Sequence, residues 1–235
     1  MLYLIGLGLN ERGISKEGLL ALEKCKKVYL EEYTIDFPYN LDELKLGKKK
    51  IIKLGRTEVE SDKLIKEAKS VDIALLVYGS PFFSTTHISL ILDAEKSGVK
   101  SKIIYSASVF DALAETGLRL SKFGKITSMP TWTQDYKPDF MQYVKENQKI
   151  KAHSLILVDI GIKFEKAIEE LEENAKKNKI KLDEIVVCSR LGTEESKILY
   201  GKIEELKKQN LPSPFCFIIP SELHFLEKEA LERFK

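Results

Sequence analysis

Residues that mark many metalloenzymes and secreted proteins are scarce in this chain of 235 residues. It holds three histidines and three cysteines, which lie far apart, with no CxxC pair and no second ligand at helical spacing from a histidine. Metal sites usually bring such ligands together at short spacings. We therefore expect no metal ion, and we interpret the scattered cysteines as buried, reduced thiols.

Long apolar stretches and common catalytic loops are also missing. No segment is long enough to span a bilayer, and no signal peptide precedes the first apolar run. The Gly-x-Ser-x-Gly elbow and the GxxxxGK[ST] loop are absent, which argues against the common hydrolases and NTPases. The 38 basic and 36 acidic residues nearly balance, whereas nucleic-acid binding usually needs a concentrated basic surface. We therefore expect a cytoplasmic protein that binds neither membranes nor nucleic acid.

The most informative segment that is present is the start of the chain. An apolar run from Leu2 to Ile5 ends in Gly6-Leu7-Gly8, which indicates a buried parallel strand with a sharp turn at its carboxyl end. A dinucleotide loop needs a third glycine three positions after the second, where this chain has Glu11. The loop therefore favours a nucleoside ligand without phosphates, or an ordinary tight turn with no ligand, and the sequence leaves both open.

Strand and helix patterns predict an α/β fold with two domains. In the first half, strands and helices alternate, which implies a parallel sheet with flanking helices over residues 1–121. The second half has several strands with fewer helices, which suggests a mixed α+β domain over residues 126–235, with the boundary in 121–125. The expected strands are 2–7, 28–30, 50–54, 72–77, 101–105, 153–160, 184–188, 196–200 and 215–219. The expected helices are 15–25, 61–69, 85–96, 108–116, 164–177 and 222–234.

Four loops follow strands at their carboxyl ends, where ligands bind in open α/β sheets. In one of them, Pro81 fixes the backbone and Gly79 allows a ligand to approach closely, just before a helix that Thr85 or Thr86 caps. Each turn alone is also explained as an ordinary strand-to-helix connection. The four loops are Gly6–Leu9, Gly79–Phe83, Ser106–Val109 and Asp159–Gly161.

Taken together, these segments resemble the diphthine synthases, the diphthamide-pathway branch of the tetrapyrrole methylase superfamily. The resemblance covers nearly the whole chain. The segments that match the family are, in order, Leu2–Leu9, Glu11-Arg12 with Ile14, Gly18-Leu19, Glu31 with Tyr33-Thr34, Gly79-x-Pro81 followed by Thr85-Thr86-His87, Thr116-Gly117-Leu118, Lys122-Phe123-Gly124-Lys125, Lys145-Glu146-Asn147, Asp159-Ile160 and Leu223-His224.

The resemblance implies a homodimeric methyltransferase with two α/β domains of the tetrapyrrole methylase type. Members of the family bind S-adenosylmethionine in the cleft between these domains. They methylate the amino group of a modified histidine, the aminocarboxypropyl-histidine, on translation elongation factor 2. Carried over by position, the implied cofactor contacts are Leu9, Ser80, Phe83, Ser108, Val109, Val158, Leu191 and Phe215.

The chain departs from the family pattern at two of these positions. Ser80 stands where the family usually has aspartate, so a carboxylate facing the cationic cofactor is missing, and Phe215 replaces a histidine. These departures keep a degenerate, non-catalytic paralogue open as an alternative. Another alternative is a methyltransferase of the same superfamily that acts on a tetrapyrrole or on ribosomal RNA.

Methyl transfer to an amine mainly requires that donor and acceptor are aligned. Burial lowers the pKa of an amine, and aromatic faces tolerate the quaternary ammonium that repeated methylation produces. Tyr33, Trp132 and Tyr136 are candidates for such an aromatic wall. Glu31 could orient the amine or accept its proton, although we interpret it first as a surface carboxylate at a strand end. No catalytic residue is assigned.

Overall fold

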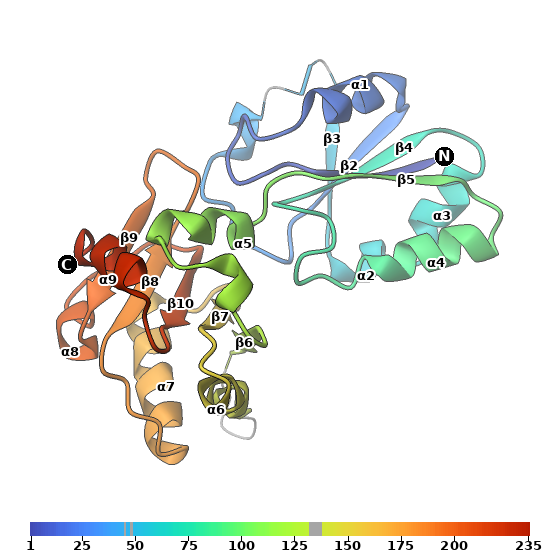
Figure 1. Cartoon of the computed structure of the whole chain (residues 1–235). Helices are drawn as coiled ribbons and strands as arrows, with labels where there is room; N and C mark the ends of the chain where they lie inside the picture. The colour runs from blue at the N-terminus through green and yellow to red at the C-terminus, as the bar shows by residue number, and fades with distance from the viewer. Residues whose placement is uncertain (45, 48, 132–137) are drawn as a thin grey trace. The chain divides into compact units, whose positions relative to one another are not determined.

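The computed structural model describes residues 1–44, 46–47, 49–131 and 138–235, which form two compact units (Figure 1). The first unit is Met1–Val109 and the second is Phe110–Lys235. This division falls earlier than the segment 121–125. The residues just after Val109 pack with the second unit, since the Phe110 and Phe123 rings meet edge to face with centroids 5.7 Å apart.

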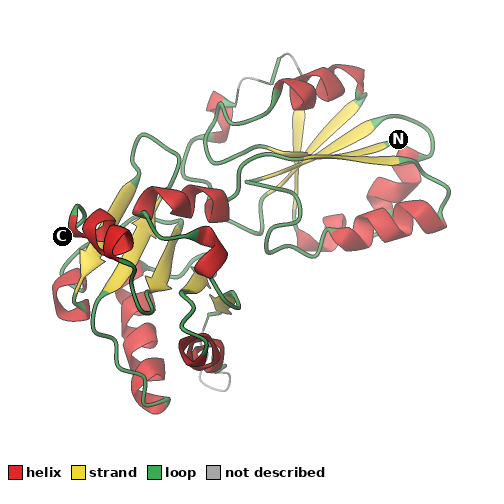
Figure 2. Ribbon diagram, in the orientation of Figure 1, coloured by secondary structure: helices red, strands yellow, loops and turns green. Residues whose placement is uncertain are grey.

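The first unit is built on a parallel five-stranded sheet in the order β3-β2-β4-β1-β5 (Figure 2). One face of the sheet packs against α3 and α4, and the other packs against α1, so the core lies in two layers. This confirms the expected parallel sheet with flanking helices. The elements are β1 (Leu2–Gly6), α1 (Lys16–Lys24), β2 (Lys27–Glu31), η1 (Leu41–Glu43), β3 (Ile51–Leu54), α2 (Arg56–Val59), α3 (Lys63–Ala68), β4 (Ile73–Val77), α4 (Ile88–Lys96) and β5 (Ser101–Ile104).

The second unit contains a mixed sheet in the order β6-β7-β10-β8-β9. Among the described strands of this sheet, only β6 and β7 pair in parallel. Helices α6, α7 and α8 supply side chains to the core on one face. The mixed sheet is as expected. No helix among the described residues is long and apolar enough to cross a membrane. The elements are α5 (Val109–Ala112), η2 (Leu113–Thr116), η3 (Leu120–Lys122), β6 (Thr127–Met129), α6 (Met141–Lys149), β7 (Ser154–Val158), α7 (Phe164–Lys177), β8 (Ile185–Ser189), β9 (Lys197–Gly201), α8 (Ile203–Leu206), β10 (Phe215–Ile219) and α9 (Phe225–Glu232).

Asn147 joins three segments of the second unit. Its side-chain oxygen accepts the backbone N–H of Lys125 at 2.8 Å, and its side-chain nitrogen donates to the Lys125 carbonyl and to the Ser154 hydroxyl. A Cβ added to Gly124 would lie 2.2 Å from the same Asn147 oxygen, so only glycine fits there. Two segments that carry the family resemblance therefore have a structural role.

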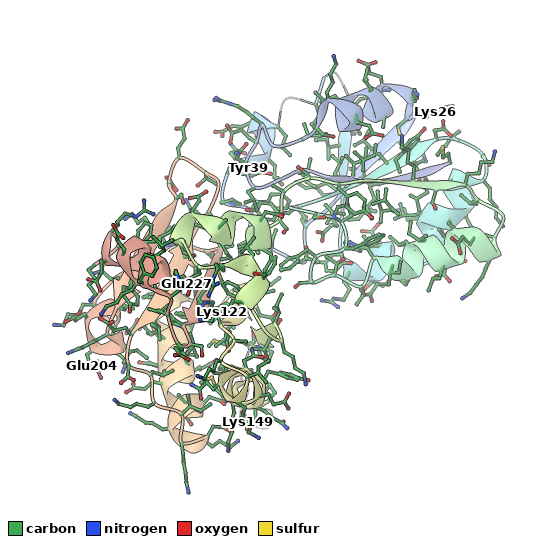
Figure 3. The ribbon with its side chains drawn as sticks, in the orientation of Figure 1. Lys26, Tyr39, Lys122, Lys149, Glu204 and Glu227 are labelled. Carbon is green, nitrogen blue, oxygen red and sulfur yellow. The ribbon has the colours of Figure 1, made fainter. Side chains whose placement is uncertain are left out.

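Glu227 is buried on α9 and ties this helix to the segment before β6. Its carboxylate accepts the backbone N–H groups of Arg119 and His224, and its Oε1 lies 3.2 Å from Nε2 of His153. Nζ of Lys122 lies 3.6 Å from Oε2 of Glu227. Both residues are labelled in Figure 3. The backbone N–H of Ser221 donates to Nδ1 of His153, so Nε2 carries the proton that is donated to Glu227.

Candidate functional site

Three loops of the first unit meet at the carboxyl edge of its sheet, because β4, β1 and β5 are neighbours in that order. Gly8 and Gly79 exchange two backbone hydrogen bonds, 3.2 and 2.9 Å long, and both have positive φ. A Cβ on Gly6 would come within 2.5 Å of the Gly79 carbonyl oxygen. The glycines of the two loops therefore allow a close approach that side chains would block.

Five of the eight expected cofactor residues lie on these loops. Leu9 follows the Gly8 turn, and its carbonyl accepts the Tyr78 hydroxyl at 3.1 Å. The Phe83 backbone N–H donates to the Ser80 carbonyl, which closes the turn that contains Ser80. A Cβ on Gly79 would meet the Ser108 Cα at 3.7 Å, so the third loop, which ends in Ser108 and Val109, packs beside the second.

The other three expected residues form a second group, at one end of the inner strands β7, β10 and β8 of the second sheet. The antiparallel register pairs Phe215 with Ser189 and Cys216 with Leu157, which places Phe215 beside Val158, the last residue of β7. Leu191 follows two residues after Ser189, where Arg190 has a φ of 50° and its backbone N–H donates to the Pro214 carbonyl. In each unit, the expected residues therefore lie together at one end of the strands.

Glu31 at the end of β2 is fully buried, so its interpretation as a surface carboxylate is wrong. Its Oε1 accepts the Thr34 hydroxyl at 2.5 Å, and the backbone N–H groups of Tyr33 and Thr34 also bind the carboxylate. Burial raises its pKa although these hydrogen bonds and the charge of Arg56 act in the opposite direction. Its Oε2 has no hydrogen-bond partner among the described residues.

Tyr33 connects this carboxylate to the Gly79–Phe83 loop through His87. The Tyr33 hydroxyl lies 3.3 Å from Nε2 of His87, and Nδ1 of His87 lies 3.2 Å from the Pro81 carbonyl. A carbonyl can only accept, so Nδ1 carries a proton. Burial lowers the pKa of His87, so the ring is neutral and Nε2 accepts the Tyr33 hydroxyl. No sequence pattern links Tyr33 to His87, and the Thr85-Thr86-His87 segment is the signal that connects His87 with this loop.

We call Glu31, Tyr33, Thr34, Arg56 and His87 the β2-end cluster. The Arg56 guanidinium lies over the Tyr33 ring, 5.0 Å from its centroid. The two other candidates for an aromatic wall, Trp132 and Tyr136, lie outside the described residues. In the part of the chain that the structure describes, no three His, Cys, Asp or Glu side chains are grouped so that they could hold a metal ion.

Comparison with known proteins identifies the class to which this fold and these loops belong. The family described as tetrapyrrole (corrin/porphyrin) methylases matches residues 1–207. The chain belongs to this family and is a methyltransferase, and its fold is the tetrapyrrole methylase fold.

Among the similar relatives are proteins named diphthine synthase and diphthine methyl ester synthase. One from Methanocaldococcus jannaschii, named diphthine synthase, is 39% identical over 253 residues and covers 99% of this chain and 98% of the relative. One from Emericella nidulans, named diphthine methyl ester synthase, is 35% identical, and the match covers 100% of this chain and 93% of the relative. A crystal structure of diphthine synthase superposes with a TM-score of 0.89 at 33% identity, covering 99% of this chain and 95% of the other.

Proposed function

We propose that this chain is a diphthine synthase. It transfers methyl groups from S-adenosylmethionine to the amino group of the aminocarboxypropyl-histidine on translation elongation factor 2, as a cytoplasmic homodimer. The observation that carries the proposal is the full-length similarity to diphthine synthases of archaea and fungi. The loops that meet at Gly8 and Gly79 support it, because a close backbone approach is needed for a ligand at the sheet edge.

The chemistry of the eight expected contacts fits S-adenosylmethionine. They are apolar side chains and the hydroxyls of Ser80 and Ser108, and none is a lysine or arginine. A cofactor with a sulfonium and an amino group needs no cationic partner, whereas a pyrophosphate does. When bound, the cofactor supplies an electrophilic methyl group, and the residues of this chain hold it in line with the acceptor amine.

Calorimetric titration with S-adenosylmethionine tests the proposed cofactor. We expect one binding site per chain and an affinity that EDTA does not change, because none of the proposed contacts needs a metal. Replacing the half-buried Phe83 by alanine removes one of the proposed apolar contacts and should weaken binding. No binding to the wild type, or loss of binding with EDTA, would contradict the proposal and favour a degenerate paralogue, which Ser80 and Phe215 keep open.

The names of the relatives raise a question about the product, since the Emericella nidulans protein is named for a methyl ester. We propose N-methylation for this chain. Mass spectrometry of the modified peptide before and after mild alkali distinguishes the two products, because alkali removes an ester methyl group and leaves N-methyl groups in place. A mass that falls after alkali treatment would show that this chain also methylates a carboxylate.

A further inference from the structure

The β2-end cluster contains a carboxylate oxygen that lacks a hydrogen-bond donor. Glu31 is fully buried, its Oε1 is held by Thr34, and its Oε2 has no partner among the described residues. Leaving such an oxygen unpaired is costly whether the group is charged or neutral. This unpaired oxygen lies at the carboxyl ends of the strands, where ligands bind in α/β sheets. The missing hydrogen-bond donor can therefore be a group of the bound ligand.

Glu31 lies beside the strand that leads into the Gly79–Phe83 loop. The parallel register pairs Leu30 with Leu76, so Glu31 lies beside Val77, the residue at which β4 ends. The Gly79–Phe83 loop follows directly, and His87 bridges its Pro81 carbonyl to Tyr33. The carboxylate and the proposed cofactor loop are therefore parts of one hydrogen-bonded arrangement.

The titratable groups around Glu31 lie on three segments: α2, the turn after β2 and the segment before α4. Arg56 of α2 favours the charged carboxylate, and Tyr33 and His87 are neutral neighbours. Burial raises the pKa of Tyr33 to about 12 and lowers that of His87, so neither competes for a proton near neutral pH. Glu60 is the other acidic group that acts on this pair.

We propose that Oε2 of Glu31 accepts a proton from the substrate's ammonium group before each methyl transfer. This inference rests on the proposed function. An N–H bond of the ammonium breaks, the proton moves to Oε2, and the neutral amine keeps the electron pair. That pair then forms the new N–C bond while the C–S bond of S-adenosylmethionine breaks and sulfur retains its electrons. The protonated Glu31 returns its proton to solvent before the next round.

The surroundings of Glu31 suit this task. Burial raises its pKa, which brings the carboxylate closer to the proton affinity of an amine. The Thr34 hydroxyl donates to Oε1, and the backbone N–H groups of Tyr33 and Thr34 also bind the carboxylate, so the side chain is held in one orientation. Thr34 and His87 are positioning residues in this arrangement, because they act through Glu31 and Tyr33.

The test is the pH dependence of methyl transfer to elongation factor 2 that carries aminocarboxypropyl-histidine, for wild type and Glu31→Gln. General acid–base catalysis contributes about 10²–10⁴-fold, so we expect kcat of the variant to fall at least about 100-fold near pH 7. Its rate should then rise about tenfold per pH unit toward the pKa of the amine, because the solution supplies the free amine. The wild-type rate should change little over this range.

Two variants and one binding measurement make the result decisive. Glu32→Gln removes the same charge at the exposed neighbour and should leave the rate and its pH dependence unchanged. Glu31→Asp keeps a carboxylate, so it should be slower with the wild-type pH profile, and it replaces Glu31→Gln if that variant does not fold. Calorimetry should show wild-type cofactor affinity in all of them.

A wild-type profile in Glu31→Gln, or a rate loss that is the same at every pH, would overturn the role of Glu31, because a structural defect does not change the profile. A rising profile in Glu31→Asp would also overturn it. A wild type that transfers no methyl group at any pH would instead overturn the proposed function.

Discussion

Ser80 is half-buried between Gly79, with a φ of 67°, and Pro81, in the loop where the family resemblance implies an aspartate. A hydrogen bond to a charged group contributes about 1.5–3 kcal/mol, and one between neutral groups about half as much. Ser80→Asp should therefore tighten S-adenosylmethionine binding roughly tenfold, equivalent to about 1.4 kcal/mol. The gain should shrink with added salt.

Calorimetry of Ser80→Asp and of Ser80→Asn, which has a similar shape without the charge, measures this effect. Only the aspartate variant should bind more tightly. If both variants bind as the wild type does, or more weakly, Ser80 does not face the cofactor and the positions carried over for this loop must be withdrawn.

Gly124 is fixed by its contact with Asn147, and this gives a prediction about stability. An added Cβ would lie 2.2 Å from the Asn147 oxygen and 3.1 Å from the Ala152 Cβ. Overpacking of this kind costs typically 1–3 kcal/mol, so Gly124→Ala should lower Tm by several degrees. Gly55→Ala is the matched control, since nothing lies within 4 Å of its added Cβ and its φ is −82°. Equal Tm values for the two variants would contradict the account of Asn147.

At the scale of single residues, sequence patterns identified the glycine loops but not the burial of Glu31. A glutamate at the end of an apolar strand has the same sequence pattern whether its side chain is exposed to water or buried. The Tyr33–His87 hydrogen bond joins residues 54 positions apart, and no local pattern encodes such a contact. The motifs that carry the family resemblance include these residues but do not indicate their contacts.

Helix α9 depends on the charge state of the buried Glu227. Burial alone would raise its pKa, but the backbone N–H groups of His224 and Arg119 and the side chain of His153 outweigh burial and lower the pKa to about 2. A carboxylate with a lowered pKa stabilises the fold above its unfolded pKa, and this contribution is lost as pH falls toward 2. The shift from 4.5 corresponds to stabilisation on the order of 3 kcal/mol.

His153 acts in the same direction on acidification. Burial lowers its pKa below 6.5 despite the opposing effect of Glu227, so the unfolded chain takes up this proton first as pH falls. We therefore expect Tm to decline steadily from pH 7 to pH 3. The Tm of Glu227→Gln should be roughly 5 °C or more lower than that of the wild type at pH 7, and it should decline less steeply below pH 4.5. Glu229 is exposed on the same helix, so Glu229→Gln should show the wild-type dependence of Tm on pH. The same dependence in Glu227→Gln would contradict the role of Glu227.

At the scale of elements, strong apolar periodicity gave the right bounds. The predicted strand 215–219 and helix 164–177 coincide with β10 and α7, and Ser15 caps α1 by accepting the Gly18 N–H at 3.0 Å. The sequence pattern does not predict α6 or β6, because α6 is mostly polar and the three residues of β6 are too few to show alternation. The expected helix 108–116 is divided into α5 and η2.

At the scale of the whole molecule, the family resemblance leads us to expect a homodimer. The chain divides into two modest units, and small units leave apolar surface that association can cover. Light scattering at micromolar concentration should give twice the chain mass of 26.8 kDa. A monomer mass that persists as the concentration is raised would contradict this expectation.

We propose that this chain methylates the aminocarboxypropyl-histidine of elongation factor 2. The most direct measurement is transfer of labelled methyl from S-adenosylmethionine to elongation factor 2 that carries this modification. The same factor with an unmodified histidine, ribosomal RNA and a tetrapyrrole serve as parallel acceptors. The account predicts label on the modified factor alone, with S-adenosylhomocysteine formed in equal amount. Label on the RNA or the tetrapyrrole, or no label on the modified factor when the cofactor is bound, would contradict it.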